Sequence, residues 1–374
     1  MMKSKVYFTS MRAKPNMNLL QKLEKLVKTA GIEQIDFKDK FTAIKIHFGE
    51  PGNLAFLRPN YSKVIADVIK GLGGKVFLTD CNTLYVGRRK NALEHLDAAY
   101  ENGYNPLTTG CQVIIADGLK GTDEAYVPVP CGEYVKEAKI GRAIMDADII
   151  ISLTHFKGHE LTGFGGALKN IGMGSGSRSG KMEMHSDGKP VVQSETCVGC
   201  GSCAKICAQS AISLIGKTAN IDKAICVGCG RCIGTCNFNA IIPAWDESND
   251  ILNKKMAEYS YAVLNGRPHF HISLVIDVSP FCDCHAENDV PIIPDIGMFA
   301  SLDPVALDMA CADMVNQTPA NSGSYLGEQL KATAGNCSDH DHFHAIHPET
   351  NWITCLDHAE KIGLGTKLYE LIEI

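Results

Sequence analysis

The sequence contains no run of about 18 or more apolar residues, so we expect no membrane-spanning helix. Its first ten residues, MMKSKVYFTS, lack the apolar stretch that export requires. The net charge is −6 and no basic patch interleaved with aromatic residues is present, which argues against nucleic acid as a partner. We therefore expect a cytoplasmic protein with no membrane span and no nucleic-acid partner.

Two common enzyme fingerprints are also missing. No G-x-G-x-x-G follows an early strand, so a tightly bound nicotinamide or flavin is not indicated. No G-x-S-x-G is present, which argues against a serine hydrolase of the α/β class. The composition is otherwise close to the globular average, with 45% hydrophobic and 21% charged residues, and 374 residues suit two or three domains.

Cysteine, in contrast, is abundant, and half of the cysteines are regularly spaced. Of the 16 cysteines, eight fall into two runs that share the spacing C-x2-C-x2-C-x3-C: Cys197, Cys200, Cys203 and Cys207, then Cys226, Cys229, Cys232 and Cys236. Bacterial two-cluster ferredoxins hold a pair of [4Fe–4S] clusters with this spacing, and the fourth cysteine of each run binds the other cluster. The spacing therefore predicts two clusters, one bound by Cys197, Cys200, Cys203 and Cys236, the other by Cys226, Cys229, Cys232 and Cys207.

Other uses of these cysteines fit the pattern less well. Structural zinc takes four ligands from two separated C-x2-C pairs, whereas here two identical quartets occur. A disulfide framework is typical of a small secreted domain. The proline that often follows the last cysteine is replaced by Ala208 and Asn237, but that proline shapes the loop and binds no iron. The cysteine count indicates a reducing compartment.

Alternating strand and helix patterns flank the cysteine runs. Six segments have strand character: Lys5–Ser10, Thr42–Phe48, Lys75–Thr79, Gln112–Ala116, Asp148–Leu153 and His269–Val278. Helices are predicted from Leu19 with Asn18 as cap, over Tyr61–Leu72, and over Val305–Val315 with Asp303 as cap. The pattern predicts an α/β fold, a largely parallel-sheet domain with an inserted bacterial-ferredoxin-like α+β module. The expected divisions are residues 1–189 and 246–374 for the α/β domain and 190–245 for the insert.

Two further stretches have a biased composition. Residues 172–185 are rich in glycine and serine, and we interpret them as a mobile linker in preference to an anion-binding loop. They are not a phosphate-binding loop of the Walker type, because Ser175 and Met182 stand where glycine and Ser or Thr are needed. In residues 339–347, alternation would place His340, His342 and His344 on one face of an extended segment, and a solvated loop is favoured over a metal site.

Chemically capable residues follow four of the predicted strands. In open α/β sheets, ligands bind beyond the carboxyl ends of the strands. We expect eight such residues to line one crevice: His47, Asp80, His155, Lys157, His159, Lys169, Cys282 and Cys284. Of these, His155, Lys157, His159 and Lys169 are the candidate catalytic residues, and Cys282, Cys284 and His47 are candidate ligands of an additional transition metal. Lysine and histidine side chains suit a small anionic ligand, although each histidine alone can be an ordinary loop residue.

Three segments resemble a known family. They are AIKIHFGEPGN at 43–53, THFKGHELTGFGGALKN at 154–170 and DPVALD at 303–308. Together they resemble the "domain of unknown function 362" family, whose members with a central ferredoxin insert are catalogued as uncharacterised iron–sulfur-centre proteins. The resemblance covers nearly the whole chain and implies a fold and a clustered site, but no substrate. A short part of the central segment is also similar to the His–Gly–Gly–Lys segment of nickel-pincer lactate racemases.

Two classes of function remain open on this basis. In the first, the α/β domain is an oxidoreductase-type enzyme that exchanges electrons with a redox partner protein through the clusters. In the second, the protein is an electron carrier or adaptor whose α/β domain docks a partner or ligand. The first is favoured because a carrier does not need a large domain with polar residues collected at strand ends. Racemase-like metal chemistry with structural clusters is a third, smaller alternative.

Overall fold

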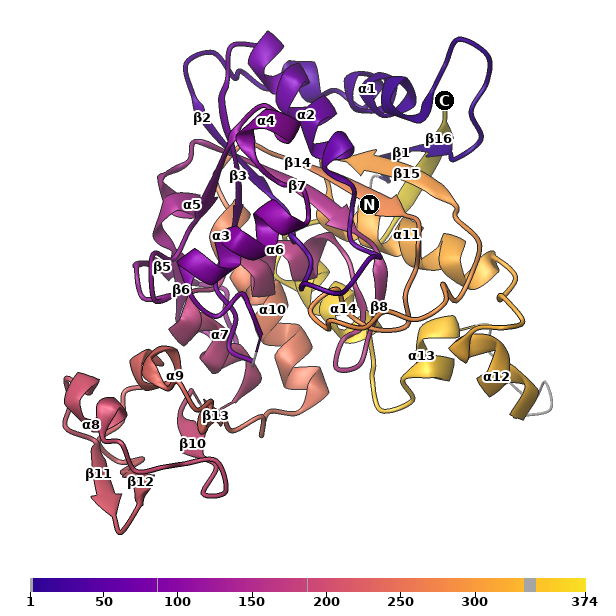
Figure 1. Ribbon diagram of the computed structural model, residues 1–374. Helices are drawn as coiled ribbons and strands as arrows, with labels where there is room; N and C mark the ends of the chain where they lie inside the picture. Colours follow the sequence, from indigo (N-terminus) through magenta and orange to yellow (C-terminus); the bar gives the residue numbers. More distant parts are fainter. Residues whose placement is uncertain (1–2, 86, 187, 333–340) are drawn as a thin grey trace.

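A computed structural model describes residues 3–85, 87–186, 188–332 and 341–374 (Figure 1). Its centre is an eight-stranded sheet of order β16-β1-β15-β14-β7-β2-β3-β4. The strands are β1 Ser4–Ser10, β2 Phe41–Lys45, β3 Lys75–Asp80, β4 Gln112–Ile115, β7 Ile149–His155, β14 His269–Val275, β15 Gly297–Ser301 and β16 Tyr369–Glu373. No helix in the described part of the chain is long and apolar enough to cross a membrane.

The sheet is mostly parallel, as predicted. Only β15 runs antiparallel to its neighbours β1 and β14, and the other neighbouring pairs are parallel. All six predicted strands are present in this sheet, whereas β15 and β16 were not predicted from the sequence. Because β1 pairs with both β15 and β16, the first and last strands of the chain lie side by side in Figure 1.

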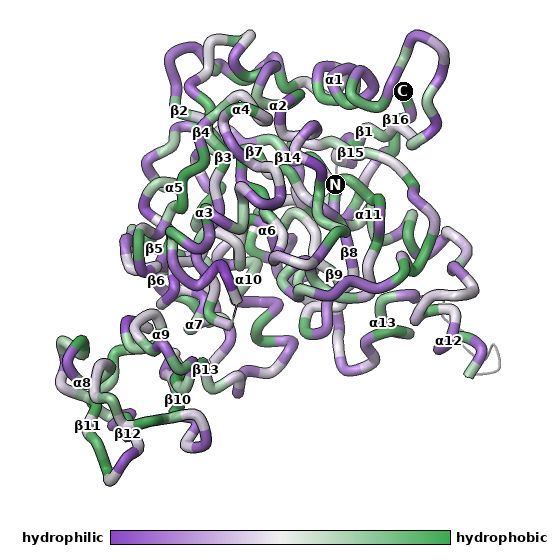
Figure 2. Tube along the Cα trace, viewed as in Figure 1, coloured by the Kyte–Doolittle hydropathy of each residue, from purple (hydrophilic) through white to green (hydrophobic). Residues whose placement is uncertain are grey.

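Helices cover both faces of the sheet. On one face lie α1 Leu19–Thr29, α2 Pro59–Gly71 and α3 Ala92–Glu101; on the other lie α6 Ala167–Ser175 and α11 Pro304–Gln317, with α10 Asn249–Leu264 and α14 Ile353–Lys361 packed behind them. In β7, Ile149 and Ile151 belong to the hydrophobic core under α1 and α2, and Ile150 belongs to the core under α6 and α11. This burial on both sides explains the continuous apolar run of β7. In Figure 2 hydrophobic colour accordingly runs through the sheet.

Two predicted helix starts are confirmed in detail. The Asn18 side chain accepts the backbone N–H of Gln21, and the Gln21 side chain accepts that of Asn18, which forms a capping box. The Asp303 carboxylate accepts the N–H groups of Val305 and Ala306, with Pro304 in the first turn. Both helices therefore begin where the sequence places their caps.

The remaining short elements complete the α/β part. They are η1 Ile32–Gln34, α4 Pro106–Thr109, β5 Glu124–Pro128, β6 Glu137–Gly141, α5 Arg142–Asp146, β8 Lys157–His159, β9 Gly163–Gly165, α12 Tyr325–Ala332 and α13 His342–Ile346. The histidine-rich run thus forms a helix over its described part, and the expected extended segment is wrong there. Asp341 caps this helix by accepting the N–H groups of Phe343 and His344. His340 lies outside the described residues.

The glycine-rich stretch from residue 172 is not a mobile linker. It forms the end of α6 and the buried helix α7, Arg178–His185, whose cap Ser177 accepts the N–H of Gly180 at 3.2 Å. A Cβ on Gly172 would lie 2.2 Å from the carbonyl oxygen of Met256, and one on Gly180 would lie 2.3 Å from that of Lys139. These glycines therefore permit close packing between backbones, and the linker interpretation was wrong.

This packing gives a direct test. We expect Gly172→Ala to lower the free energy of unfolding by about 1–3 kcal/mol, because the added methyl group must displace the backbone of α10. Gly71→Ala at the end of α2 is the matched control, because a Cβ there meets no atom within 4 Å. The control should be neutral or stabilise by up to about 1 kcal/mol. Thermal unfolding of the anaerobic proteins measures both, and equal melting temperatures would contradict the packing role.

The cysteine runs lie in a small separate lobe at the lower left of Figure 1. This segment contains β10 Pro190–Val192, α8 Ser202–Ile206, β11 Ile212–Ile215, β12 Thr218–Ile221, α9 Arg231–Thr235 and β13 Ile241–Pro243. Strands β11 and β12 form a hairpin, and β10 pairs with β13 so that Pro190 lies opposite Pro243. The chain therefore leaves the α/β part and returns to it through one two-stranded ribbon.

Candidate functional site

A cavity with an empty volume of about 960 Å³, part of it open to solvent, lies at the carboxyl ends of the parallel strands. Strands β2, β3 and β7 and the loop after β14 all contribute to its wall. The eight residues expected at a crevice all line this cavity: His47, Asp80, His155, Lys157, His159, Lys169, Cys282 and Cys284. The structure therefore brings them together, while their individual roles depend on the contacts described next.

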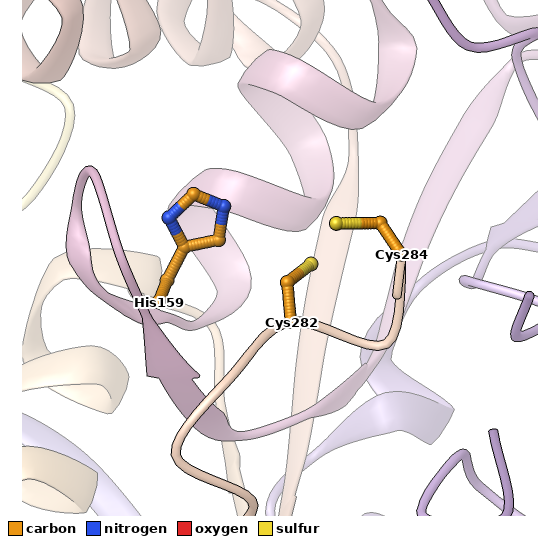
Figure 3. Close-up of side chains that lie close together, drawn as sticks. All are labelled: His159, Cys282 and Cys284. Carbon is orange, nitrogen blue, oxygen red and sulfur yellow. The ribbon is translucent and has the colours of Figure 1, made fainter. Parts of the chain in front are cut away.

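Two thiols and an imidazole meet inside the cavity. The ligand atoms of His159, Cys282 and Cys284 all lie within 4.8 Å of one another, and Figure 3 shows the three side chains pointing toward one another. The Lys169 Nζ lies 3.5 Å from the Cys282 Sγ. A hydrogen bond from Cys284 lowers the pKa of Cys282 well below its usual value, and Lys169 and His159 act in the same direction against burial. The Cys282 sulfur thus lies beside a cation that favours its thiolate form.

The loop that carries these cysteines is fixed by its central residue. Asp283 accepts from His155 Nδ1 at 2.8 Å, and the Lys157 Nζ lies 3.4 Å from its other oxygen. Burial alone would raise the pKa of Asp283, but His155 and Lys157 outweigh it and hold that pKa below its usual range. The His155 Nε2 faces the carbonyl oxygen of Ile276 at 2.8 Å. Because both ring nitrogens of His155 face acceptors, neither is open to the cavity.

The other predicted metal ligand, His47, stands apart from the thiols. Its Nε2 lies 2.8 Å from Arg89 Nη1 and its Nδ1 accepts the backbone N–H of Gly49 at 3.1 Å. Burial, followed by the charge of Arg89, lowers the pKa of His47 well below its usual value. Arg89 in turn pairs with Glu50 at 2.8 Å. A guanidinium thus faces the nitrogen that would bind a metal, so the expected role of His47 has no support in this geometry.

Asp80 is neutralised at the cavity wall by a residue that sequence reasoning missed. The Lys45 Nζ lies 2.9 Å from the Asp80 Oδ1 and 2.9 Å from the Asn170 Oδ1. Burial raises the pKa of Asp80, but Lys45, His95 and His47 outweigh it and the net shift is downward. The signal in the sequence was a lysine inside an apolar strand, which is rarely buried without a partner.

Two further cavity residues lie on α7, in the stretch that the sequence suggested was a linker. Lys181 is buried and donates to the carbonyl oxygens of Gly176 at 2.6 Å and Gly174 at 3.3 Å. His185 stacks edge-on against Trp245, with ring centroids 4.7 Å apart. Burial, followed by the charges of His159, Lys169 and Lys181, lowers the pKa of His185 to about 3, so the ring is neutral at physiological pH. Among the described contacts, Lys181 has no carboxylate partner within 4.0 Å.

The cysteine segment contains two hollows, each lined by four cysteines. One is lined by Cys197, Cys200, Cys203 and Cys236, and the other by Cys207, Cys226, Cys229 and Cys232. Each hollow thus combines three cysteines of one run with the last cysteine of the other. The two last cysteines have equivalent partners, because Cys207 Sγ accepts the N–H of Ala211 and Cys236 Sγ that of Ala240, both at 3.3 Å.

One apolar cluster joins this segment to the cavity. Leu84 and Met182 of the α/β part pack together with Cys203, Cys232 and Ile233. Leu84 also lines the cavity, so a single side chain contacts both regions. A polar contact supports this junction, since the Lys90 Nζ donates to the Asn239 Oδ1 at 2.6 Å.

Residues 42–313, almost three quarters of the chain, match the family described as "Domain of unknown function (DUF362)". The chain belongs to this family. The match includes the cysteine segment and every strand end of the cavity, so the family expected from the sequence is confirmed. No curated protein matches the DUF362 chain in sequence.

Two solved structures resemble the DUF362 chain in the path of the backbone over part of their length. The lactate racemase apoprotein from Thermoanaerobacterium thermosaccharolyticum is 15% identical over 72% of this chain and 51% of its own, with a TM-score of 0.38. A protein from Thermotoga maritima solved by a structural genomics consortium is 14% identical over 75% and 54%, with a TM-score of 0.37. The chain thus spans about half the length of each. At these scores the similarity carries no information on activity.

Proposed function

We propose that this DUF362 protein is an iron–sulfur redox protein whose residues 190–245 form a ferredoxin-like insert with two [4Fe–4S] clusters. The insert would pass single electrons between a redox partner protein and a small anionic substrate in the cavity, as in an oxidoreductase. The two cysteine-lined hollows carry this proposal, because each has the crossed set of four cysteines that the doubled spacing requires.

The cysteine geometry supports clusters over single metal ions. Four sulfurs around one zinc at about 2.3 Å would all lie within about 4 Å of one another. Among the described residues, no three sulfurs of either quartet form a group whose ligand atoms all lie within 4.8 Å of one another, as binding of a single ion would require. Gly199 and Gly228 have φ of 67° and 71°, which only glycine adopts easily and which the tight loops around a cluster require. The N–H groups of Ala211 and Ala240 would help to set the cluster potentials.

The contacts of the insert support an electron route that reaches both the cavity and the surface of the protein. Leu84 and Met182 pack in one apolar cluster with Cys203 and Cys232, and Leu84 also lines the cavity. On the far side, Cys200 is exposed, and this gives a partner protein access to the hollow that Cys200 lines. These contacts support an electron route between a partner protein at the surface and the cavity.

An anionic substrate is supported by the cations that the cavity leaves without carboxylates. Of the two lysines expected to hold it, Lys157 already pairs with Asp283, and Lys169 contacts a thiol. Lys181 takes the place of Lys157 in the proposal, because its described contacts are to carbonyl oxygens alone. Lys169, Lys181 and His185 all line the same cavity. His155 and Lys157 are then positioning residues that hold Asp283 and the thiol loop.

A binding experiment tests this function. Anaerobic protein is titrated with a panel of 2-oxo and 2-hydroxy carboxylates and inorganic phosphate, and binding is measured by calorimetry. We expect at least one of these anions to bind and to reoxidise the reduced protein. Lys181→Met should weaken binding roughly 10- to 100-fold, the worth of a charge-assisted hydrogen bond of about 1.5–3 kcal/mol. Lys181→Arg should retain most of it, and Lys40→Met, at an exposed ion pair with Asp36, is the control.

The alternative function predicts a different result. If the protein is an electron carrier, no anion of the panel binds, Lys181→Met changes nothing, and reduced protein exchanges electrons with ferredoxin-type proteins alone. That outcome would contradict the enzyme proposal and leave the clusters intact.

A further inference from the structure

A group of side-chain atoms of the kinds that bind metals lies inside the cavity and has no role in the function proposed above. His159 and Cys284 belong to one such group with Cys282, and Cys284 also belongs to a second with Glu160 and His285, each within 4.8 Å. We propose that Cys282, Cys284 and His159 bind one divalent transition metal, with a coordination position open to the cavity. This inference deepens the proposed function, because the metal would face the same substrate.

The burial of these side chains argues for a metal over plain packing. Cys282 is 1% exposed and His159 is 5% exposed, yet both line the cavity, as does Lys169. Binding of a metal through both sulfurs would require two thiolates, and Lys169, at 3.5 Å from Cys282, supplies only one positive charge. A divalent ion would balance the pair, and thiolate and imidazole are the ligands that bind zinc and its neighbours most strongly.

A carboxylate oxygen without a hydrogen-bond partner beside the group also supports a bound metal. Glu160 binds His285 through Oε1 at 2.9 Å, but its buried Oε2 has no hydrogen-bond partner among the described residues. This oxygen lies 3.9 Å from His159 Nδ1. Histidine that binds a metal through Nε2 commonly donates its other N–H to a carboxylate. With the metal bound, His159 would exchange its present backbone donors, Leu161 and Thr162, for Glu160 as acceptor.

The ligand number indicates the kind of site. Two cysteines and one histidine, with a fourth position for water or substrate, are typical of catalytic zinc, whereas structural zinc has four protein ligands. His47 is excluded as the fourth ligand by its contact with Arg89. The open position would therefore face the cavity, where the metal would polarise an oxygen of the anionic substrate.

The test uses the full chain, purified anaerobically with its iron. Wild type, Cys282→Ala, Cys284→Ala and the control Cys81→Ala are each incubated with zinc, desalted and assayed for metals. Cys81 also lines the cavity and is buried, but it lies outside the group. We expect wild type and Cys81→Ala to retain about one zinc and the other two variants none, with the iron content the same in all four. Glu160→Gln should weaken zinc binding by about 10- to 100-fold.

Cobalt gives an independent readout. Wild type loaded with Co²⁺ should show thiolate-to-cobalt charge transfer and intense tetrahedral visible bands in the difference spectrum against the zinc form. Cys282→Ala should abolish them. Wild-type zinc no higher than that of Cys282→Ala would overturn the metal site, as would a Cys282–Cys284 disulfide that persists in the anaerobic protein. Absence of iron with zinc retained would instead contradict the clusters and leave this site standing.

Discussion

Replacing Cys207 or Cys236 by alanine should remove one of the two proposed clusters. Cys207→Ala should remove the cluster bound by the second cysteine run, and Cys236→Ala the cluster bound by the first. Wild-type protein should contain about eight iron and eight labile sulfide, and each variant about four of each. The reason is the crossed lining of the two hollows, in which Cys207 lies with the second run and Cys236 with the first.

Double variants identify which cluster is lost. Cys207→Ala with Cys226→Ala should retain about four iron, because both residues line one hollow. Cys207→Ala with Cys197→Ala should lose nearly all iron, because these two line different hollows. If ligation stayed within each run, the two results would be exchanged. Cys131→Ala, at an exposed cysteine outside both runs, is the control and should keep the full complement.

A chain that ends near Met184 should not fold, whereas residues 190–245 alone should bind both clusters. Within the large sheet, β1 pairs with β15 and β16, and β7 has β14 as one of its two neighbours. The shortened chain lacks all three of these partners, so β1 has no strand beside it. In the proposed insert, ligation by iron would supply much of the folding energy.

Circular dichroism and gel filtration test this pair of fragments. The first fragment should aggregate or show no cooperative unfolding, and the second should become brown and folded on reconstitution with iron and sulfide. A first fragment that is monomeric and unfolds cooperatively would contradict the single shared sheet. An insert that binds no iron would contradict its independence.

The convergence of the site could be predicted from the sequence because it depends on topology. Parallel strands bring their carboxyl ends to one edge, so His47, Asp80 and His155 had to lie near one another once the sheet was recognised. The edge strand β16 was missed because it is short, contains two glutamates and has no buried residue. The doubled cysteine spacing is a local pattern, so its crossed lining of the hollows followed directly.

The chemistry of individual side chains could not be predicted in the same way. His47 and His155 have similar sequence contexts, but Arg89 and Asp283 come from distant segments and determine what their ring nitrogens contact. Lys181 and His185 were missed because glycine and serine indicate flexibility in a sequence, and only the facing backbones of α10 and β6 reveal that these glycines are packed. Composition carries no information about such long-range neighbours.

The pairing of β1 with β15 and β16 also sets the order in which this protein can mature on the ribosome. Strand β1 emerges first, but both of its partners emerge last. The cysteine segment emerges between them, before β14 completes the centre of the sheet. The cysteine segment is thus complete on a nascent chain whose large sheet is still open, so loading of the proposed clusters would not require closure of the α/β fold. Synthesis in this order leaves β1 unpaired for longer than any other strand of the large sheet, with its edges exposed until β15 and β16 are made.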